Sequence, residues 1–410
     1  MLATVRTRTI LETVVISICL VSNQLGNMVN SIGKSAVTKQ PRSQRIMKNR
    51  IVTFGEIMGR LAPEGFLRLR QALPGKLDLT FAGAEANVAA SIAYLGGQAS
   101  FVTALPDNPL AEACLGTLRN IGVHTDHVVT TQTGRLGLYF VETGANQRPS
   151  NVIYDREGSS IALTAPDRYN WTEILKGAGW LHVTGITPAL SKNAAEATLD
   201  ATKAARELGV TVSCDLNFRK KLSNWRAGTD ARRLARETME GILPHVDLLI
   251  GNEEDADDVL GIRASGSDVD AGQLETGRYP EVAREIVGRF PNIRRVATTL
   301  RESISASHNN WGALLYDAET DRPFFAPVRE GRYAPFEIRN IVDRVGGGDS
   351  FAAALIFAQT TTELAPLQTT LDFAVAASCL AHSIKGDFNY NRRSEVEALA
   401  KGSGSGRVVR

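Results

Sequence analysis

Short apolar runs that suit β-strands alternate with longer helical patterns along most of this chain. The alternation is regular in the second half, where strands are predicted at 180–183, 210–214, 248–250, 295–299 and 311–316. Helices are predicted at 192–208, 230–243, 253–260 and 281–290. Apolar strands that alternate with helices predict an α/β fold with a largely parallel sheet, covered by helices on both faces.

The first half begins in the same way and then departs from the pattern. Strands are predicted at 51–54 and 99–104, and helices at 87–95 and 110–121, which end at Gly96-Gly97 and Gly122. Short strands are predicted at 128–129, 138–142 and 151–154. Residues 58–81 are broken by Pro63, Gly65, Pro74 and Gly75, so we interpret them as a small excursion outside the core sheet.

Candidate polar and glycine residues lie at the ends of several predicted strands or within two residues after them. They are Gly185, Asp215, Asn252 and Thr299. Ligands of parallel α/β sheets bind beyond the carboxyl ends of the strands. The positions of these residues therefore predict a single site at that edge of the sheet.

Three consecutive glycines, Gly346, Gly347 and Gly348, precede Asp349 and an apolar helical run. Glycines between a strand and a helix let backbone N–H groups converge at the positive end of the helix dipole, which suits a phosphate. Asp349 would then stand beside the transferred group and accept a proton from an attacking hydroxyl. The alternative is a plain glycine turn in which Asp349 is a helix N-cap.

Two polar stretches contain arginines that could hold an acidic substrate. Arg219 lies in 215–221, directly after a predicted strand, and Arg156 lies in 154–160 beside Tyr154. A guanidinium grips a carboxylate through two parallel hydrogen bonds, so the pair suggests a small acidic substrate. The alternative for 215–221 is a solvated loop.

Asn252-Glu253-Glu254-Asp255 lies at a predicted strand-to-helix junction. These oxygens would suit a hydrated Mg²⁺ near nucleotide phosphates. Alternatively, the acids only complement the helix N-terminus. The sequence contains no Gly-x-x-x-x-Gly-Lys-Ser/Thr pattern, which argues against a P-loop enzyme.

Composition narrows the class of protein further. The 410 residues carry 46 basic and 44 acidic side chains, a formal net charge of +2, which does not predict a nucleic-acid-binding surface. The four cysteines, Cys19, Cys114, Cys214 and Cys379, match no metal-ligand spacing and are typical of free thiols in a reducing compartment. The apolar run at 10–21 is too short to span a bilayer. We therefore expect a cytoplasmic protein without a membrane partner.

The two ends of the chain are set apart from the rest. Met47 directly precedes the first predicted strand, and 34–50 is polar and basic. We interpret 1–46 as a disordered extension or a mis-assigned start, 47–400 as the main domain, and the Gly/Ser-rich 401–410 as a disordered tail.

Taken together, the glycine-aspartate turn, Gly83-Ala84-Glu85-Ala86-Asn87 and Asn252-Glu253-Glu254-Asp255 resemble the ribokinase-like (PfkB) carbohydrate kinases over about 51–400. The stretches 137–139, 154–159, 184–191 and 215–219 resemble most the branch of that family that acts on 2-keto-3-deoxygluconate. The resemblance implies a three-layer α/β/α Rossmann-like ribokinase fold with a small β-sheet lid at about 58–81 and 133–156. It also implies ATP and Mg²⁺, and a homodimer or higher assembly through the lid.

The resemblance assigns roles to individual residues. It implies Asp349 as the catalytic base with Gly346, Gly347 and Gly348 as the anion hole. The implied substrate contacts are Gly83, Asn87, Tyr139, Tyr154, Arg156, Ile186, Arg219 and Asp387. The implied nucleotide contacts are Asn252, Thr299, Gly346 and Gly348, with Asp255 near Mg²⁺ through water.

The sequence departs from the family pattern at three of these positions. Arg344 replaces the usual Thr and Gly347 the usual Ala of the glycine turn, and Asp255 replaces a Glu one methylene longer. Arg344 could lie near the nucleotide phosphates or point to solvent.

The activity that the resemblance implies is transfer of the γ-phosphoryl group of ATP to the terminal hydroxyl of 2-keto-3-deoxygluconate. Two alternatives remain open at this point. One is a kinase of a neutral sugar such as fructose or ribose, and the other is a non-catalytic sugar-binding regulator.

Overall fold

The computed structural model describes residues 49–252, 254–263 and 276–403, all within the unit Met47–Arg410. The predicted extension at 1–46, Glu253, and residues 404–410 of the predicted tail lie outside the described residues. Lys401 and Gly402 belong to a turn after the last helix.

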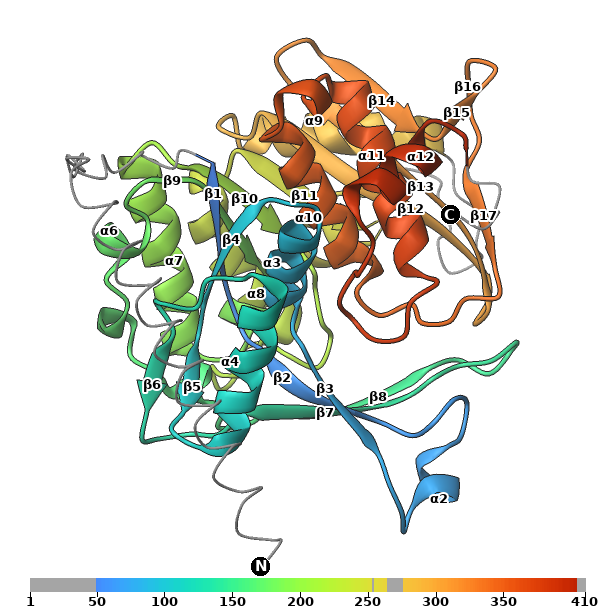
Figure 1. Ribbon diagram of the computed structural model, residues 1–410. Coiled ribbons are helices and arrows are strands. Elements are labelled where there is room, and N and C mark those ends of the chain that lie inside the picture. The colour runs from blue at the N-terminus through green and yellow to red at the C-terminus, as the bar shows by residue number, and fades with distance from the viewer. Residues whose placement is uncertain (1–48, 253, 264–275, 404–410) are drawn as a thin grey trace, which may run out of the picture. The chain divides into compact units, whose positions relative to one another are not determined.

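The main sheet has nine strands in the order β14-β13-β12-β11-β10-β9-β1-β4, with β17 paired to β13 (Figure 1). Its strands are β1 (Arg50–Phe54), β4 (Gln98–Val102), β9 (Ala178–Thr184), β10 (Thr211–Asp215), β11 (Leu248–Asn252), β12 (Arg295–Ser305), β13 (His308–Asp317), β14 (Arg322–Ala326) and β17 (Phe336–Arg339). The pairings from β4 to β12 are parallel, whereas β13 pairs antiparallel with β12, β14 and β17. The prediction of a largely parallel sheet is therefore confirmed, with an antiparallel edge.

A separate four-stranded sheet, called here the small sheet, has the order β3-β2-β7-β8 and lies below the main sheet in Figure 1. Its strands are β2 (Met58–Ala62), β3 (Asp78–Ala82), β7 (Gly137–Glu142) and β8 (Asn151–Asp155). They fall within or beside the two ranges expected for a lid. Two short ribbons complete the strands: β5 (Ala104–Pro106) with β6 (Val129–Thr131), and β15 (Val328–Arg329) with β16 (Arg332–Tyr333).

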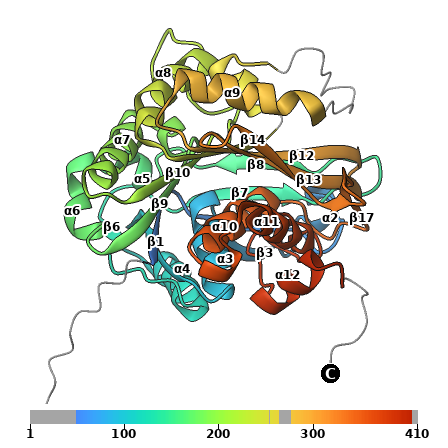
Figure 2. The same cartoon turned by 90° about the horizontal axis from the view of Figure 1, so that it is seen from above.

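Helices cover both faces of the main sheet, as Figure 2 shows. The larger ones are α3 (Ala84–Tyr94), α4 (Pro109–Ile121), α7 (Lys192–Glu207), α8 (Ala231–Ile242), α9 (Tyr279–Arg289), α10 (Gly347–Gln359), α11 (Leu367–Ala381) and α12 (Arg393–Ala400). The one-turn helices are α2 (Leu69–Ala72), α5 (Ser160–Leu163) and α6 (Trp171–Ile174). A π-helical turn lies at η4 (Ala256–Leu260), and 3₁₀ turns lie at η1 (Pro166–Arg168), η2 (Thr187–Ala189), η3 (Leu243–His245), η5 (Thr276–Arg278) and η6 (Thr362–Leu364).

Two apolar clusters fill the space between the sheet and its helices. On β1, Ile51 packs in a cluster with side chains of α3, α4, α10 and α11, while Val52 and Phe54 pack in a cluster with side chains of α6, α7, α8 and α9. Successive side chains of a strand point to opposite faces. The alternation along β1 therefore buries both faces and gives the three-layer α/β/α arrangement.

Local chemistry explains where several helices begin and end. Asn108 caps α4 by accepting the N–H of Ala111 at 3.0 Å, and Gly122 ends that helix at a φ of 99°. Ser191 caps α7 and Asp230 caps α8 in the same way. These boundaries are close to the predicted ones, because cap residues are local signals.

The structure differs from the sequence-based elements in several places. β12 runs to Ser305 instead of ending at residue 299, and β14, α11 and α12 were not predicted. The strand predicted at 99–104 is two strands, β4 and β5, separated by Thr103. The helix predicted at 253–260 is described as the π-helical turn η4 preceded by Asp255. Asp349 is not a helix N-cap: Gly346 occupies the N-cap of α10, and Asp349 is the third residue of the helix.

Candidate active site

A cavity of about 560 Å³ lies between the small sheet, the carboxyl ends of the central strands and the start of α10. Fourteen of the fifteen residues predicted for the site line it: Gly83, Asn87, Tyr139, Tyr154, Arg156, Ile186, Arg219, Asn252, Asp255, Thr299, Gly346, Gly348, Asp349 and Asp387. Gly347 is buried next to this wall, where an added Cβ would lie 3.1 Å from Cε1 of His382. The structure therefore brings these distant segments together.

Asp349 stands in the first turn of α10 and opposite α3. Asn87 Nδ2 donates a hydrogen bond to Asp349 Oδ2 at 2.6 Å, which fixes the direction of the carboxylate. Burial of the carboxyl group raises the pKa of Asp349 to about 6, and the charge of Asp387 adds to this against the Asn87 hydrogen bond. A carboxylate with a pKa close to neutral is suited to accept a proton.

The glycine turn is built so that backbone approaches backbone. Gly346 has a φ of 83°, and a Cβ at this position would lie 2.2 Å from the carbonyl oxygen of Asp387. The first N–H groups of α10 have no intrahelical acceptor, since the helix begins at Gly347. The turn can therefore present N–H groups to an anion beside Asp349.

Glu85 is a buried acid of the site. It lies within the motif at 83–87, but the sequence analysis predicted no role for it. It is 1% exposed, and its Oε1 accepts hydrogen bonds from the hydroxyls of Thr184 at 2.7 Å and Thr187 at 2.8 Å. Burial raises its pKa to about 7 despite these bonds. The signal for this residue was a lone carboxylate in the first turn of an otherwise apolar helix.

Asp215 is a second buried acid of the site. Its position at a strand end was predicted, but no role was predicted for it. It is 8% exposed and lines the cavity at the end of β10. Burial raises the pKa of Asp215 well above its usual range, and the charges of Asp255 and Asp349 raise it further. Neighbouring acids with raised pKa values attract cations or protons into the cavity.

The two predicted arginines have different surroundings. Arg156 is buried, and its guanidinium forms an ion pair with Glu56 Oε2, including a 2.8 Å hydrogen bond from Nε. Arg219 is exposed, and its Nη1 donates to the carbonyl oxygen of Phe218 at 3.1 Å. The charge of Arg156 is already balanced by Glu56, a residue that sequence reasoning missed, while Arg219 keeps most of its donors for a ligand.

Asp255 and Asn252 form a hydrogen-bonded network with the backbone at the end of β11. The Asp255 carboxylate is 3% exposed and accepts the backbone N–H of Phe218 at 3.1 Å and of Asn252 at 2.9 Å. Asn252 Oδ1 in turn accepts the N–H groups of Glu254 and Asp255. Within residues 49–252, 254–263 and 276–403, no group of three or more His, Cys, Asp or Glu side chains is arranged to hold a metal ion.

Arg344, which replaces the Thr of the family pattern, is hydrogen-bonded to the turn between β12 and β13. Its Nη2 donates to the carbonyl oxygens of Ser305 at 2.9 Å and Ala306 at 2.8 Å, in the turn between β12 and β13. It also lines the cavity. Its charge therefore lies at the wall formed by this turn.

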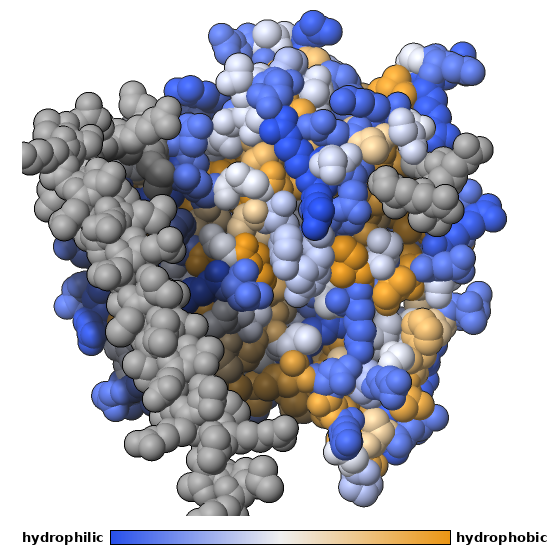
Figure 3. All heavy atoms as spheres, viewed as in Figure 1, coloured by the Kyte–Doolittle hydropathy of each residue, from blue (hydrophilic) through white to orange (hydrophobic). Residues whose placement is uncertain are grey.

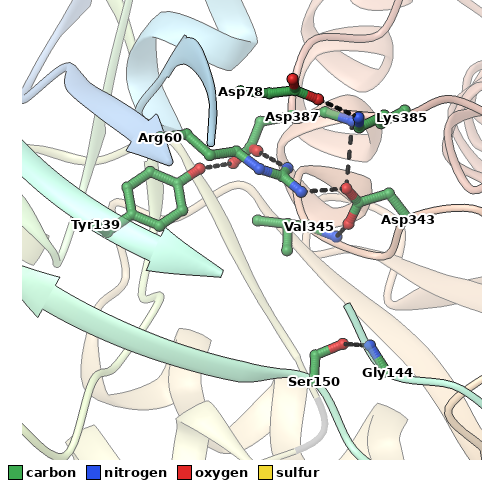
Figure 4. A network of polar contacts seen from close by, with 10 residues as sticks. Arg60, Asp78, Tyr139, Gly144, Ser150, Asp343, Val345, Lys385 and Asp387 are labelled. Atoms are coloured by element: carbon green, nitrogen blue, oxygen red, sulfur yellow. Dashed lines mark hydrogen bonds and ion pairs between the residues drawn. The ribbon is translucent and has the colours of Figure 1, made fainter. Parts of the chain in front are cut away.

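Tyr139 and Asp387 bind each other, and both belong to a buried network that contains Arg60 (Figure 4). Tyr139 donates its hydroxyl to Asp387 Oδ2 at 2.8 Å, and the Arg60 guanidinium pairs with Asp387 and Asp343. Burial raises the pKa of Asp387, while the Arg60 charge opposes this. Arg60 was not predicted, because a single arginine in a strand carries no motif.

None of the described helices is both long and apolar enough to cross a membrane.

Comparison with known proteins gives one consistent family. The model of the pfkB family carbohydrate kinases matches residues 48–276. The chain is 32% identical over 360 residues to a 2-dehydro-3-deoxygalactonokinase of Haloferax volcanii, an alignment that covers 88% of this chain and 99% of the relative. It is 26% identical to a probable fructokinase-3 of Arabidopsis thaliana, over 83% of this chain and 87% of the relative.

Among solved structures, the 2-dehydro-3-deoxygluconokinase of Thermotoga maritima is 44% identical and superimposes with a TM-score of 0.77. The superposition covers 86% of this chain and 100% of that one. The likeness confirms the predicted ribokinase-type α/β/α fold. The chain belongs to the pfkB family of carbohydrate kinases, which are phosphotransferases with an alcohol group as acceptor.

Proposed function

We propose that this protein transfers the γ-phosphoryl group of ATP to the terminal hydroxyl of a 2-keto-3-deoxy sugar acid, with 2-keto-3-deoxygluconate as the substrate. The observation that carries the proposal is the position of Asp349, which lies beside the N–H groups of the glycine turn and is held by Asn87 inside the cavity. The likeness to 2-keto-3-deoxy sugar acid kinases supports the choice of sugar.

In the proposed reaction, Asp349 accepts the proton of the terminal hydroxyl as its oxygen forms a bond to the γ-phosphorus. The bond from that phosphorus to the bridging oxygen breaks, and ADP leaves. The N–H groups of Gly346, Gly347 and Gly348 stabilise the charge on the transferred group. Removing one such preorganised donor typically costs about 3–4 kcal/mol of transition-state stabilisation, so the turn has to be held accurately.

The sugar acid is proposed to lie under the small sheet, which acts as a lid. Its carboxylate or keto group would be held by Arg219, with Arg156 kept in place by Glu56. Gly83, Asn87, Tyr139, Tyr154, Ile186 and Asp387 would form the remaining wall.

The nucleotide is proposed to lie along Asn252, Thr299, Gly346 and Gly348. Oxygen donors of the kind that Mg²⁺ prefers line the cavity at the ends of β10 and β11, on Asp215, Asn252, Glu254 and Asp255, but these side chains, all among the described residues, do not form a direct ligand cluster. Both Asp255 oxygens already accept backbone N–H groups, so this residue would hold a hydrated ion through water. When bound, Mg²⁺ neutralises charge on the phosphates.

The competing substrate is a neutral sugar, which the likeness to a probable fructokinase favours. Steady-state phosphorylation of 2-keto-3-deoxygluconate, its galactonate epimer, fructose and ribose separates the two. We expect a much higher kcat/KM for the sugar acids, because a hydrogen bond between a guanidinium and the substrate carboxylate contributes about 1.5–3 kcal/mol. A preference for fructose or ribose would contradict the sugar-acid assignment while leaving the family unchanged.

A second copy of the chain is the proposed partner of the small sheet. Leu79 and Ile153 on its strands are 45% and 48% exposed, and Phe66 and Leu73 near α2 are 52% and 44% exposed. Figure 3 shows apolar side chains among polar ones over the lower right of this face, the region where Figure 1 draws the small sheet. Exposed apolar groups of this kind mark interaction surfaces. Analytical ultracentrifugation should detect a dimer that Leu79→Lys weakens; a monomer at micromolar concentration would contradict the assignment.

A further inference from the structure

Arg60 lies on β2 of the small sheet, but its guanidinium forms ion pairs with residues next to the glycine turn. The residue is 2% exposed, and its guanidinium forms ion pairs with Asp343 through Nη2 and with Asp387 through Nη1. Figure 4 shows the guanidinium between the two carboxylates. One guanidinium thus pairs with two buried acids that come from different segments of the chain.

Both acids contact the glycine turn or the residues beside it. Asp343 precedes Gly346 by three residues, and its carboxylate also accepts the N–H of Val345 and the N–H of Gly386, each at 3.2 Å. Asp387 touches the turn through its backbone, since a Cβ on Gly346 would lie 2.2 Å from its carbonyl oxygen. A shift of either acid would therefore move the backbone that forms the anion hole.

Two other strands of the small sheet reach the same segment. Tyr139 on β7 donates its hydroxyl to Asp387 Oδ2 at 2.8 Å. Asp78 on β3 forms a 2.6 Å ion pair with Lys385, but both side chains are 56% exposed. Exposed ion pairs contribute little, whereas loss of one partner from a buried cluster leaves an uncompensated charge. Arg60 is thus the buried cation of this junction.

We propose that Arg60 is a positioning residue for phosphoryl transfer: by holding Asp343 and Asp387, it keeps the glycine turn and Asp349 in place relative to a sugar bound under the small sheet. The inference rests on the proposed function of this site. Without the guanidinium, the two buried carboxylates would repel each other and the turn would move. The turn acts on the transferred group, so the loss should fall on kcat more than on the KM for sugar.

The test compares Arg60→Ala, Arg60→Lys and Asp78→Ala in the full chain with the wild type. Arg60→Ala should lower kcat about 100-fold, the size of effect that a small misplacement causes, with a much smaller change in the KM for sugar. Millimolar guanidinium ion should restore part of the kcat of Arg60→Ala, but none of that of Asp349→Asn. Asp78→Ala removes an exposed contact between the same segments, so it should keep wild-type kcat.

A folded Arg60→Ala protein with wild-type kcat, or with a loss that guanidinium does not relieve, would overturn the proposal. If Arg60→Ala does not fold, Arg60→Lys decides, because one ammonium cannot pair with both carboxylates in the geometry of the guanidinium. Reduced kcat at nearly unchanged KM in Arg60→Lys would support the proposal, and unchanged kcat would overturn it. The wild type is assayed first on all four sugars, and the variants then on the sugar it prefers, so a wrong substrate assignment is distinguished from a wrong role for Arg60.

Discussion

At the scale of single residues, Asp349 is the most informative side chain, because its surroundings determine its protonation. Its pKa of about 6 lies above the usual value, mainly through burial. A base works only when deprotonated, so kcat/KM should fall as the pH drops below 6, to about a tenth of its plateau at pH 5. A pH profile of kcat/KM with the preferred sugar tests this. A plateau that continues down to pH 5 would contradict the assigned base.

Arg219 is an exposed cation that lines the cavity, as is its neighbour Lys220, while Arg156 is bound to Glu56. Arg219→Ala should lower kcat/KM for a sugar acid by about 10- to 100-fold, as expected for loss of a charge-assisted contact of about 1.5–3 kcal/mol. Steady-state kinetics of Arg219→Ala and of the wild type, with the sugar acid and with fructose, measure this loss in kcat/KM. Arg233→Ala is a matched control, because that arginine is exposed on α8 and lies outside the cavity. Equal losses on both sugars would argue against a carboxylate contact.

The positions of the candidate site residues were only partly predictable from the sequence. Asp349, Asn87 and the glycines were found because motifs fix them to the ends of strands and the starts of helices. Arg60, Glu56 and Glu85 were given no role, because their importance comes from contacts with residues as far away as Asp387, and no local pattern records such pairs. Conversely, the sequence gave no reason to distinguish Arg156 from Arg219, whereas the structure separates them by burial and by the Glu56 contact.

At the scale of secondary-structure elements, Glu85 joins the start of α3 to the end of β9 through Thr184 and to η2 through Thr187. Its pKa is about 7 in the folded protein, against an ordinary value of 4.5. The folded state therefore binds more protons than the unfolded state between these pH values, and the free energy of unfolding falls as pH rises through that window. The stability that the protonated group contributes is present at low pH and lost by about pH 7.

Glu85→Gln removes this titration. The free energy of unfolding of the variant relative to the wild type should therefore rise between pH 5 and pH 8, by up to about 3 kcal/mol. Urea denaturation of both proteins at the two pH values measures the change, and any constant packing penalty of the glutamine cancels in it. Parallel pH dependences of the two proteins would show that Glu85 is ionised throughout.

Elements were predictable where local chemistry fixes them. The caps of α4, α7 and α8 and the apolar runs of β9, β10 and β11 lie close to their predicted positions. Two features could not be predicted from the local sequence. The break between β4 and β5 depends on the pairing of β5 with β6, and the π-helical turn η4 depends on packing beside α8.

At the scale of the whole molecule, the alternation of strands and helices indicated a largely parallel sheet covered on both faces, and the resemblance indicated the family and its small β-sheet lid. The alternation of strands and helices was sufficient for the first, since apolar strands need cover on both faces. It could not say that β2, β3 and β7 of the small sheet would all contact the segment 385–387. Such contacts join residues more than two hundred positions apart and become visible only in three dimensions.

Asp349 is proposed as the base of a sugar-acid kinase. Asp349→Asn keeps the size of the side chain and its contact with Asn87, so the protein should fold and still bind the sugar and ATP. Single-turnover phosphorylation of 2-keto-3-deoxygluconate by this variant is the most direct test. We expect the rate to fall by about 10²- to 10⁴-fold with little change in sugar binding. A variant that retains most of the wild-type rate would contradict the assignment of Asp349 as the base.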